Sequence, residues 1–358
     1  MRRPRGAPGT AVAELAFRAV TKRYGTGRAA LLDFDFEPPA RRLSAILGPS
    51  GSGKSTLLRI AAGLEAASAG TVTLDGRDLG PLAPGDRPIA FLAQGELLFP
   101  HLNVIENVAF GLRASGLSEA EVLRRGRATL EMLGLVGFEA QAPAQLSGGQ
   151  AQRVALARAL VLEPEVILLD EPLANLDEPL KRRLRGEMRD LQRLVGVTML
   201  VVTHDQAEAM AVADHVALLH EGRLMQDGTP REVYADPCSE YVAACLGDVE
   251  LLPARVLGQG RVQVGTLVLE GVAGATGPAR RVRLMVRPQA WRLEAVGSGR
   301  GMPGRIVRKA YLGRLAEYVV ACDLGEVLAL VPSGAALHEV DAPVDLMLGT
   351  QGLKVLPD

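Results

Sequence analysis

The segment Gly-Pro-Ser-Gly-Ser-Gly-Lys-Ser-Thr at residues 48–56 constrains the fold of this chain more than any other feature. It matches the phosphate-loop pattern G-x-x-x-x-G-K-[ST]. The apolar-rich run 42–47 before it is typical of a buried strand, and the run 57–62 after it predicts a helix that ends at Gly63. Strand, glycine loop and helix follow one another as the motif requires, which argues against a merely flexible Gly/Ser loop.

Each residue type in this loop suits a chain of phosphates. The glycines allow tight turns that point backbone N–H groups inward, and the following helix adds the positive end of its dipole. Lys54 is expected to place a charge between the β- and γ-phosphates, and Ser55 to offer its hydroxyl to Mg²⁺. The predicted phosphate-binding residues are Gly48, Pro49, Ser50, Gly51, Ser52, Gly53, Lys54, Ser55 and Thr56.

Length and composition limit the class of protein. A chain of 358 residues allows two or three domains, and a formal net charge of −1 gives no indication of a nucleic-acid partner. Three cysteines without a C-x-x-C pair indicate a reducing compartment rather than a disulfide or metal framework. No apolar run approaches the roughly 18 residues of a membrane helix, and none of signal-peptide length follows the basic start. We therefore expect a cytosolic chain with a disordered arm at 1–12.

Two further predicted strands are followed by residues that can act on a nucleotide. Residues 166–169 are continuously apolar, as in a strand buried on both faces, and Asp170 and Glu171 come next. Because ligands lie beyond the carboxyl ends of such strands, Asp170 is predicted to hold Mg²⁺ and Glu171 to polarise the attacking water. A charged pair that merely ends a strand is the alternative. The run 198–203 predicts another such strand, which would let His204 reach the γ-phosphate.

Residues 146–150, Leu-Ser-Gly-Gly-Gln, predict a second anion-binding helix start. Ser147 is a good N-cap, and Gly148 and Gly149 expose backbone N–H groups at the start of a helix that runs through Leu160. The chain has two such phosphate-binding ends but only one phosphate loop, so the sequence alone leaves open which anion the second end binds.

Taken together, these motifs resemble the ATP-binding subunits of ATP-binding-cassette (ABC) transporters over about residues 13–235. The phosphate loop, the Leu-Ser-Gly-Gly-Gln signature and the Asp-Glu strand end occur in that family's order and spacing. The resemblance implies that Tyr24 stacks on adenine and that Gln94 is the Q-loop glutamine. It also implies that 173–177 is the D-loop and His204 the switch histidine. The implied catalytic residues are Glu171, His204 and Gln94, and the implied Mg²⁺ ligands are Ser55, Gln94 and Asp170.

In that family two subunits face head to tail, and the signature of one closes over the ATP of the other. The resemblance therefore implies an ATP-bridged homodimer with ATP and Mg²⁺ as cofactors. It explains the second anion-binding end, which serves the partner's nucleotide. The residues implied to act across the dimer are Ser147, Gly148, Gly149, Gln150 and Asp177.

The segment 98–104 continues the match toward importers of the maltose, polyamine, sulfate and ferric-iron groups. Residues from about 103 to 145 alternate apolar and charged side chains at helical spacing, which fits the family's helical subdomain, expected at about 97–160. The resemblance implies that this subdomain and the Gln94 loop together form a groove, and that a coupling helix of the membrane subunit binds in it. The resemblance thus implies two transmembrane permease subunits, a solute-binding protein, and a peripheral place at the cytoplasmic face of the plasma membrane.

Beyond residue 240 the pattern changes to short alternating strands, at 261–264, 267–269, 281–286 and 316–320. They predict a small all-β barrel over 241–358, and 286–289 and 311–313 resemble the oligomer-binding-like (OB-like) C-terminal domain of the same importers. An oligonucleotide-binding barrel is the alternative, but a basic-aromatic stripe is lacking. The predicted fold is thus an α/β P-loop ATPase cassette over 13–240, with a RecA-like core and a helical subdomain, followed by an OB-like barrel.

Other functions remain as alternatives. A soluble non-transport ABC ATPase of DNA repair or translation would carry a coiled coil, a zinc motif or two cassettes, whereas this chain has one cassette and no heptad run. A P-loop kinase or GTPase would lack the signature, and the Asn-Lys-x-Asp string is absent. Because the cassette does not touch the cargo, the substrate stays open among polyamines, sulfate or molybdate, and sugars. Residues 94–101 resemble the branch of this family that imports ferric iron or another small inorganic ion, and this resemblance favours such a substrate.

Overall fold

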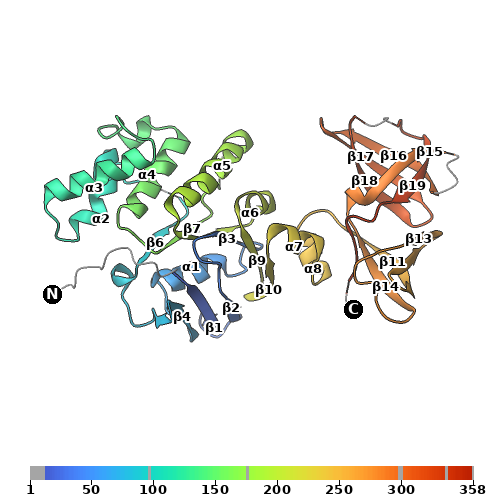
Figure 1. Cartoon of the computed structure of the whole chain (residues 1–358), viewed down its shortest axis with the longest axis horizontal. Helices are drawn as coiled ribbons and strands as arrows, with labels where there is room; N and C mark the ends of the chain where they lie inside the picture. Colours follow the sequence, from blue (N-terminus) through green and yellow to red (C-terminus); the bar gives the residue numbers. More distant parts are fainter. Residues whose placement is uncertain (1–12, 96–97, 175–176, 297–300, 335–337, 357–358) are drawn as a thin grey trace. The chain divides into compact units, whose positions relative to one another are not determined.

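The computed structural model describes residues 13–95, 98–174, 177–296, 301–334 and 338–356. They form two compact units, Met1–Pro230 and Arg231–Asp358, which are described separately (Figure 1). The predicted disordered arm at 1–12 lies outside the described residues, as do positions 96–97 and 175–176 of the Q-loop and D-loop segments. Within the described residues, no helix has the length and apolar character needed to span a membrane.

A six-stranded sheet forms the centre of the first unit, in the order β10-β9-β3-β8-β7-β6. Its strands are β3 (Leu43–Leu47), β6 (Ile89–Leu92), β7 (Val166–Asp170), β8 (Thr198–Thr203), β9 (His215–His220) and β10 (Arg223–Gly228). β6, β7, β8, β3 and β9 are parallel, and only β10 runs antiparallel. The strands β3, β7 and β8 are buried throughout, which explains their continuous apolar runs.

The register of this sheet brings three loops together. Leu47 at the end of β3 pairs with Thr203 at the end of β8, and Asp170 at the end of β7 pairs with Val202. The phosphate loop, the Asp170–Glu171 pair and His204 therefore emerge side by side at one edge of the sheet.

An antiparallel sheet forms a second layer of the same unit. It has the order β2-β1-β4-β5 and consists of β1 (Leu15–Arg23), β2 (Ala29–Phe36), β4 (Ala69–Leu74) and β5 (Arg77–Asp78). Helix α1 (Lys54–Ala62) shares one apolar core with both sheets, to which Phe17, Leu57 and Leu168 contribute. The helix ends at Gly63, whose φ of 80° is left-handed, as the sequence predicts.

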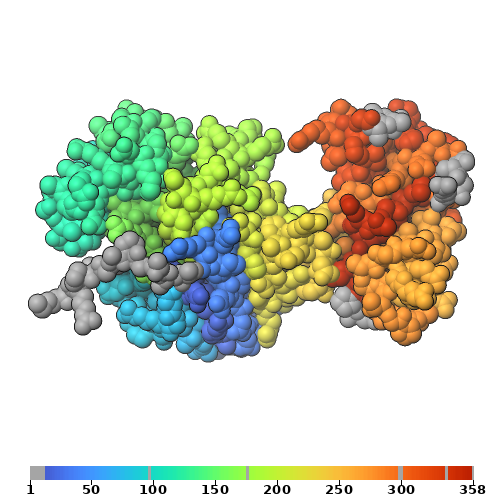
Figure 2. Space-filling model, in the orientation of Figure 1, coloured from blue at the N-terminus to red at the C-terminus, as the bar shows by residue number. Residues whose placement is uncertain are grey.

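The helices of residues 104–160 form a lobe of the first unit, whose atoms are drawn in green above the blue and cyan atoms of the preceding residues in Figure 2. They are α2 (Val104–Arg113), α3 (Glu119–Met132) and α4 (Gly148–Leu160), and α5 (Glu178–Val195) and α6 (Gln206–Val212) follow in the chain. The fully buried Asn107 holds the preceding loop, because its Nδ2 donates to the carbonyl oxygens of Phe99, Leu102 and Asn103.

The second unit contains two short helices and an all-β core. The helices are α7 (Pro230–Ala235) and α8 (Glu240–Cys245). The strands are β11 (Glu250–Gly258), β12 (Arg261–Val264), β13 (Leu267–Leu269), β14 (Arg280–Val286), β15 (Trp291–Ala295), β16 (Met302–Tyr311), β17 (Leu315–Cys322), β18 (Gly325–Pro332), β19 (Pro343–Leu348) and β20 (Leu353–Val355). They make two five-stranded antiparallel sheets, β13-β12-β11-β14-β20 and β15-β19-β16-β17-β18, which enclose one apolar core.

Arg287 joins the two short helices to this β core. It is fully buried, and its Nη1 donates to the carbonyl oxygens of Ala243, Gly247 and Asp248 at 2.9, 3.0 and 3.3 Å. Its guanidinium carbon lies 4.3 Å from the centre of the Tyr234 ring. The chain consequently divides between Pro230 and Arg231 rather than after residue 240, because α7 and α8 pack with the tail.

We expect Arg287→Ala to lower the free energy of unfolding of the second unit by about 1.5–3 kcal/mol, because it removes charge-assisted bonds to buried carbonyls. Trp291 is the only tryptophan of the chain and is 2% exposed within this unit. Its fluorescence during urea unfolding therefore reports on the tail alone. Arg281→Ala, at an exposed position of β14, is the matched control and should leave the midpoint unchanged. Equal midpoints for the two variants would contradict the anchoring role.

Candidate nucleotide-binding site

The backbone of the phosphate loop has the shape that its glycines predict. Gly51 and Gly53 have left-handed φ angles of 78° and 105°. A side chain at Gly53 would place its Cβ 2.3 Å from the carbonyl oxygen of Ala30, and one at Gly48 would lie 2.2 Å from that of Leu219. No other residue type fits these two positions without moving the backbone.

Lys54 lies at the centre of this loop. It is 5% exposed, and its Nζ donates to the carbonyl oxygens of Gly48 and Pro49 at 2.9 and 3.0 Å. Burial lowers the pKa of Lys54, while the nearby Glu171 and Asp170 carboxylates raise it. Among the described residues it forms no ion pair, so its charge is available to an anion inside the loop.

Ser55 and Asp170 meet as expected for a metal site. Ser55 Oγ donates to Asp170 Oδ1 at 3.0 Å. Burial raises the pKa of Asp170, the Ser55 bond lowers it, and Glu171 raises it further. In the described part of the chain, no group of three or more His, Cys, Asp or Glu side chains is arranged to hold a metal ion by itself. A hydroxyl and one carboxylate fit Mg²⁺, which usually takes few protein ligands and completes its shell with phosphate oxygens and water.

The Glu171 side chain contacts residues that follow the two strands on either side of β7. Its Oε2 accepts from Gln94 Nε2 at 3.1 Å, and its Oε1 lies 3.1 Å from His204 Nδ1. Gln94 follows β6, Glu171 follows β7 and His204 follows β8. The structure thus brings together the three residues for which the sequence predicts a catalytic role.

The backbone of Glu171 is unusual. Its φ of 45° is left-handed, which costs a non-glycine residue of order 1–3 kcal/mol. The backbone is held there because Glu171 N donates to Val202 O and Ala174 N donates to Glu171 O, at 3.0 and 3.1 Å. This conformation directs the carboxylate toward Gln94 and His204.

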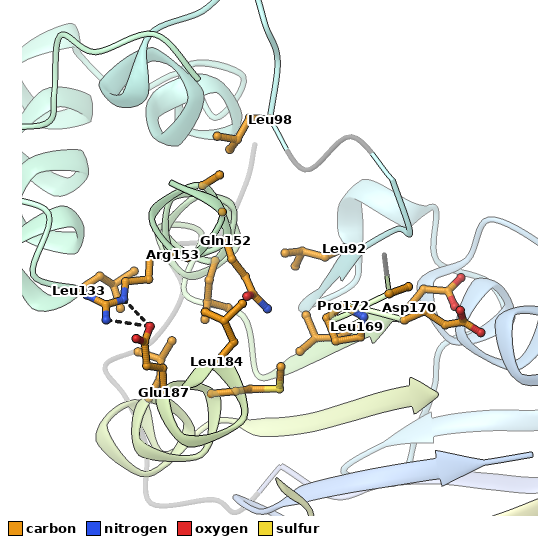
Figure 3. Close-up of a pocket in the computed structure, with 18 of the residues that line it drawn as sticks. Leu92, Leu98, Leu133, Gln152, Arg153, Leu169, Asp170, Pro172, Leu184 and Glu187 are labelled. Atoms are coloured by element: carbon orange, nitrogen blue, oxygen red, sulfur yellow. Dashed lines mark hydrogen bonds and ion pairs between the residues drawn. The ribbon is translucent and has the colours of Figure 1, made fainter. Parts of the chain in front are cut away.

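A cavity of about 610 Å³ lies between α4, α5 and the ends of β6 and β7 (Figure 3). Its lining is mostly apolar and includes Leu92, Leu133 and Leu184, while Asp170 lies at one end of it. Arg153 and Glu187 form an ion pair of 2.7 Å across α4 and α5. A smaller cavity of about 170 Å³ lies beside Glu171 and His204.

The second predicted phosphate cradle, residues 147–150, begins α4. Ser147 Oγ accepts from Gln150 N at 3.3 Å, and Ser147 N donates to Gln150 Oε1 at 2.8 Å, which makes a capping box. Gly149 is buried, and a Cβ there would lie 3.2 Å from Leu184. No hydrogen bond between this cradle and the phosphate loop occurs in the described residues. Within one chain the two segments are therefore not joined to each other.

The remaining predicted residues lie at the edges of the site. Tyr24 is 50% exposed, and its hydroxyl bonds Glu65 and lies 3.4 Å from Thr56 Oγ1 at the start of α1. Lys22 Nζ lies over one face of its ring, 5.0 Å from the ring centre, so only the other face could receive a planar group. Asp177 caps α5, with Oδ1 accepting from Leu180 N at 2.8 Å. Positions 175 and 176 of the predicted D-loop lie outside the described residues.

Two models of protein families match this chain. One, described as ABC transporter, matches residues 31–174, and the other, described as TOBE domain, matches residues 284–355. The two matches fall in the first and the second unit.

Known proteins resemble nearly the whole chain. A Fe(3+) ions import ATP-binding protein of Agrobacterium fabrum is 42% identical over 328 residues, which are 90% of this chain and 91% of that protein. A spermidine/putrescine import ATP-binding protein of Methylococcus capsulatus is 42% identical over 318 residues, 87% of this chain and 82% of that one. Among solved structures, a dimeric ATP-binding cassette in a post-hydrolysis state, bound to ADP and Pi, is 33% identical. It has a TM-score of 0.52 and covers 61% of this chain and 99% of that chain.

Proposed function

The chain belongs to the family of ATP-binding proteins that power ABC importers, and from that premise we propose that its transporter carries ferric iron. The similarity to Fe(3+) import proteins over about nine-tenths of both chains carries this proposal. A polyamine is the second candidate, because the spermidine/putrescine import protein has the same percentage identity.

Uptake by intact cells tests the cargo. A bacterium without its own ferric-iron importer would express this chain together with the permease and binding-protein genes that neighbour its gene. We expect uptake of radioactive ferric iron, and none when the chain carries Glu171→Gln. Uptake of labelled spermidine with no uptake of iron would replace the first candidate with the second.

We assign the binding of ATP to the phosphate loop and to the face of Tyr24. The buried Lys54 ammonium and the inward N–H groups of residues 48–56 suit the β- and γ-phosphates. Ser55 and Asp170 would hold Mg²⁺. Gln94, whose Nε2 lies 3.1 Å from Glu171 Oε2, would be the third ligand of the metal. When bound, the metal neutralises phosphate charge.

We assign hydrolysis to Glu171 and its two neighbours. A carboxylate beyond the end of β7 can accept the proton of the attacking water as that water adds to the γ-phosphorus, while the bond from this phosphorus to the bridging oxygen breaks and ADP leaves. His204 contacts Glu171 and can hold the γ-phosphate oxygens on the same side. Gln94 can orient the water, because its amide already lies against the same carboxylate.

We infer that two copies of the chain enclose two ATP molecules. The cradle at residues 147–150 begins α4 with the N–H groups of Gly148 and Gly149, and in the described residues no hydrogen bond joins it to the phosphate loop, so the nucleotide of a partner copy would complete it. The similar solved cassette is dimeric and bound to ADP and Pi. Asp177, at the start of α5, would lie at the same interface.

We propose that the helical lobe docks on membrane permease subunits through its aromatic cluster. Phe99 and Phe110 have ring centres 4.6 Å apart, and Arg158 lies 4.7 Å above Phe99. Phe110 is 52% exposed, so an apolar surface remains for a helix of the permease. Such docking would place the chain at the cytoplasmic face of the membrane, and a solute-binding protein would deliver cargo on the other side.

Lys54→Ala is expected to weaken ATP binding by about 10- to 150-fold, because a charge-assisted contact of about 1.5–3 kcal/mol is lost. Titration of the purified variant with a fluorescent ATP analogue measures the change. Arg77→Ala is the control, since Arg77 is exposed in β5 of the same unit and should leave the affinity unchanged. If Lys54→Ala binds ATP as tightly as the unmodified chain, the assignment of the loop is wrong.

A further inference from the structure

Three hydrogen bonds join Thr203, Asp205 and Glu208 in a closed ring around the backbone of His204. Thr203 Oγ1 donates to Glu208 Oε2 at 2.7 Å, and Asp205 N donates to Thr203 Oγ1 at 3.0 Å. Glu208 N then donates to Asp205 Oδ1, also at 3.0 Å. The ring fixes the backbone on both sides of His204 without touching its side chain.

The His204 side chain needs such support. It is 55% exposed, so packing does not determine its orientation. The Nδ1 atom of His204 lies 3.1 Å from Glu171 Oε1. The direction in which the imidazole projects therefore depends on the backbone between Thr203 and Asp205.

The burial of the Glu208 carboxylate is unfavourable in free energy. Glu208 is 3% exposed on the first turn of α6, and its Oε1 is buried with no hydrogen-bond partner in the described part of the chain. Burial raises the pKa of Glu208, an effect that the Thr203 bond opposes. The same side chain lines the 170 Å³ cavity that Glu171 and His204 line. A buried acid with this cost beside a reactive site indicates a role in that site.

The ring is also anchored to α5. Asp205 Oδ2 lies 3.4 Å from Arg185 Nη2 and 3.6 Å from Lys181 Nζ. Arg185 is 9% exposed, and its Nη1 lies 3.0 Å from Glu178 Oε1 at the start of α5. The backbone around His204 is thus held from α6 by Glu208 and from α5 by Arg185.

We propose that Glu208, acting through the Thr203 hydroxyl, is a positioning residue that holds His204 against Glu171 during ATP hydrolysis. This inference rests on the function proposed above. Glu208 keeps the Thr203 hydroxyl oriented so that its lone pair faces Asp205 N, and that bond sets the turn at His204. Loss of the hydroxyl frees the turn, and the imidazole then samples positions away from the γ-phosphate.

A pair of substitutions at Thr203 tests the ring. Thr203→Val keeps the shape and removes the hydroxyl, and it is expected to lower kcat about tenfold or more, since small misplacements of reacting groups are costly. The affinity for ATP should change little, because Lys54 and the phosphate loop are untouched. The melting temperature should fall, because the buried Glu208 carboxylate loses its bond from Thr203, so kcat is compared well below the melting temperature of the variant. Thr203→Ser retains the hydroxyl and should restore kcat. A kcat of Thr203→Val equal to that of the unmodified chain overturns the proposal.

A second pair tests Glu208 itself. Glu208→Gln keeps an oxygen that can accept from Thr203, so kcat should be nearly retained, whereas Glu208→Met removes the acceptor and should lower kcat as Thr203→Val does. Equal rates for these two variants, both folded by thermal denaturation, contradict the positioning role.

The double substitution Thr203→Val with His204→Ala distinguishes a loss of His204 positioning from an unrelated loss of activity. If the ring acts only through His204, adding Thr203→Val to His204→Ala costs no further rate. An additional loss of similar size overturns the positioning role while leaving the proposed function intact. Normal hydrolysis by His204→Ala alone overturns both the proposed role of His204 and this inference.

Discussion

Glu171→Gln is expected to lower the rate of ATP hydrolysis by about 10²- to 10⁴-fold while ATP affinity is retained. The amide has the size of the carboxylate but cannot accept the proton of the attacking water. Lys54, Ser55 and Asp170, which would bind the phosphates and the metal, are unchanged. Phosphate release measures the rate, and equilibrium binding of a fluorescent ATP analogue measures the affinity.

Glu163→Gln is a close control for this substitution. Glu163 also has a left-handed φ, of 52°, but its side chain is 74% exposed and pairs with Arg125 away from the site. Its replacement by Gln should leave both rate and affinity unchanged, which separates the loss of the base from any effect of the backbone conformation. Hydrolysis at the normal rate by Glu171→Gln would show that another group takes the proton.

The core of the first unit could be predicted because its strands are buried on both faces. Such strands carry unbroken apolar runs, and 166–169 and 198–203 correspond to β7 and β8. The helix after the phosphate loop ends at Gly63 as predicted. The predicted fold class, a P-loop ATPase cassette followed by an all-β OB-like domain, is confirmed by the two family matches and the similar solved cassette.

The antiparallel sheet was not predicted, and its irregularity explains why. The pairing of β1 with β2 is interrupted by repeated register shifts, which break the strict alternation that marks a strand. Asp33, in β2, has a left-handed φ of 46°, which is rare in a regular strand. Local sequence carries little signal for such a sheet.

The division of the chain illustrates a different limit. A change from helical to alternating patterns occurs near residue 240, but α7 lies before that position, α8 begins at it, and both helices pack with the tail. The contact responsible is Arg287 with Ala243 and Tyr234, residues far apart in the sequence. Periodicity describes single elements and contains no information about which unit a short helix joins.

The candidate site shows the same contrast. Its motif residues were found because loops that bind phosphate need particular residue types at fixed spacing. The residues that hold the backbone next to these motif residues were not predicted. Glu208 and Arg185 match no motif, since a carboxylate and a guanidinium on helices usually face solvent. Only the coordinates place Glu208 against Thr203, and Arg185 against Asp205.

ATP is expected to convert the Glu171→Gln chain from monomer to dimer, because each unhydrolysed nucleotide bridges one phosphate loop and the partner's cradle at 147–150. Light scattering after size exclusion should report about twice the 37.9 kDa mass with ATP and the single mass without it. Adding Ser147→Arg should abolish the dimer. The exposed Ser147 caps α4 with its hydroxyl, and a long side chain there would fill the space of the γ-phosphate and end the capping box.

Ser118→Arg provides the matched control for the dimer. Ser118 is also an exposed N-cap in the helical lobe, and its hydroxyl accepts from Glu121 N at the start of α3, but it does not belong to the proposed cradle. The ATP-dependent dimer should persist with Ser118→Arg, although both variants lose one helix cap of about 1 kcal/mol. Because the loss of capping is shared, only the difference between them reports on the phosphate bridge. A dimer that survives Ser147→Arg, or that both substitutions abolish equally, would show that ATP does not join the two chains through α4.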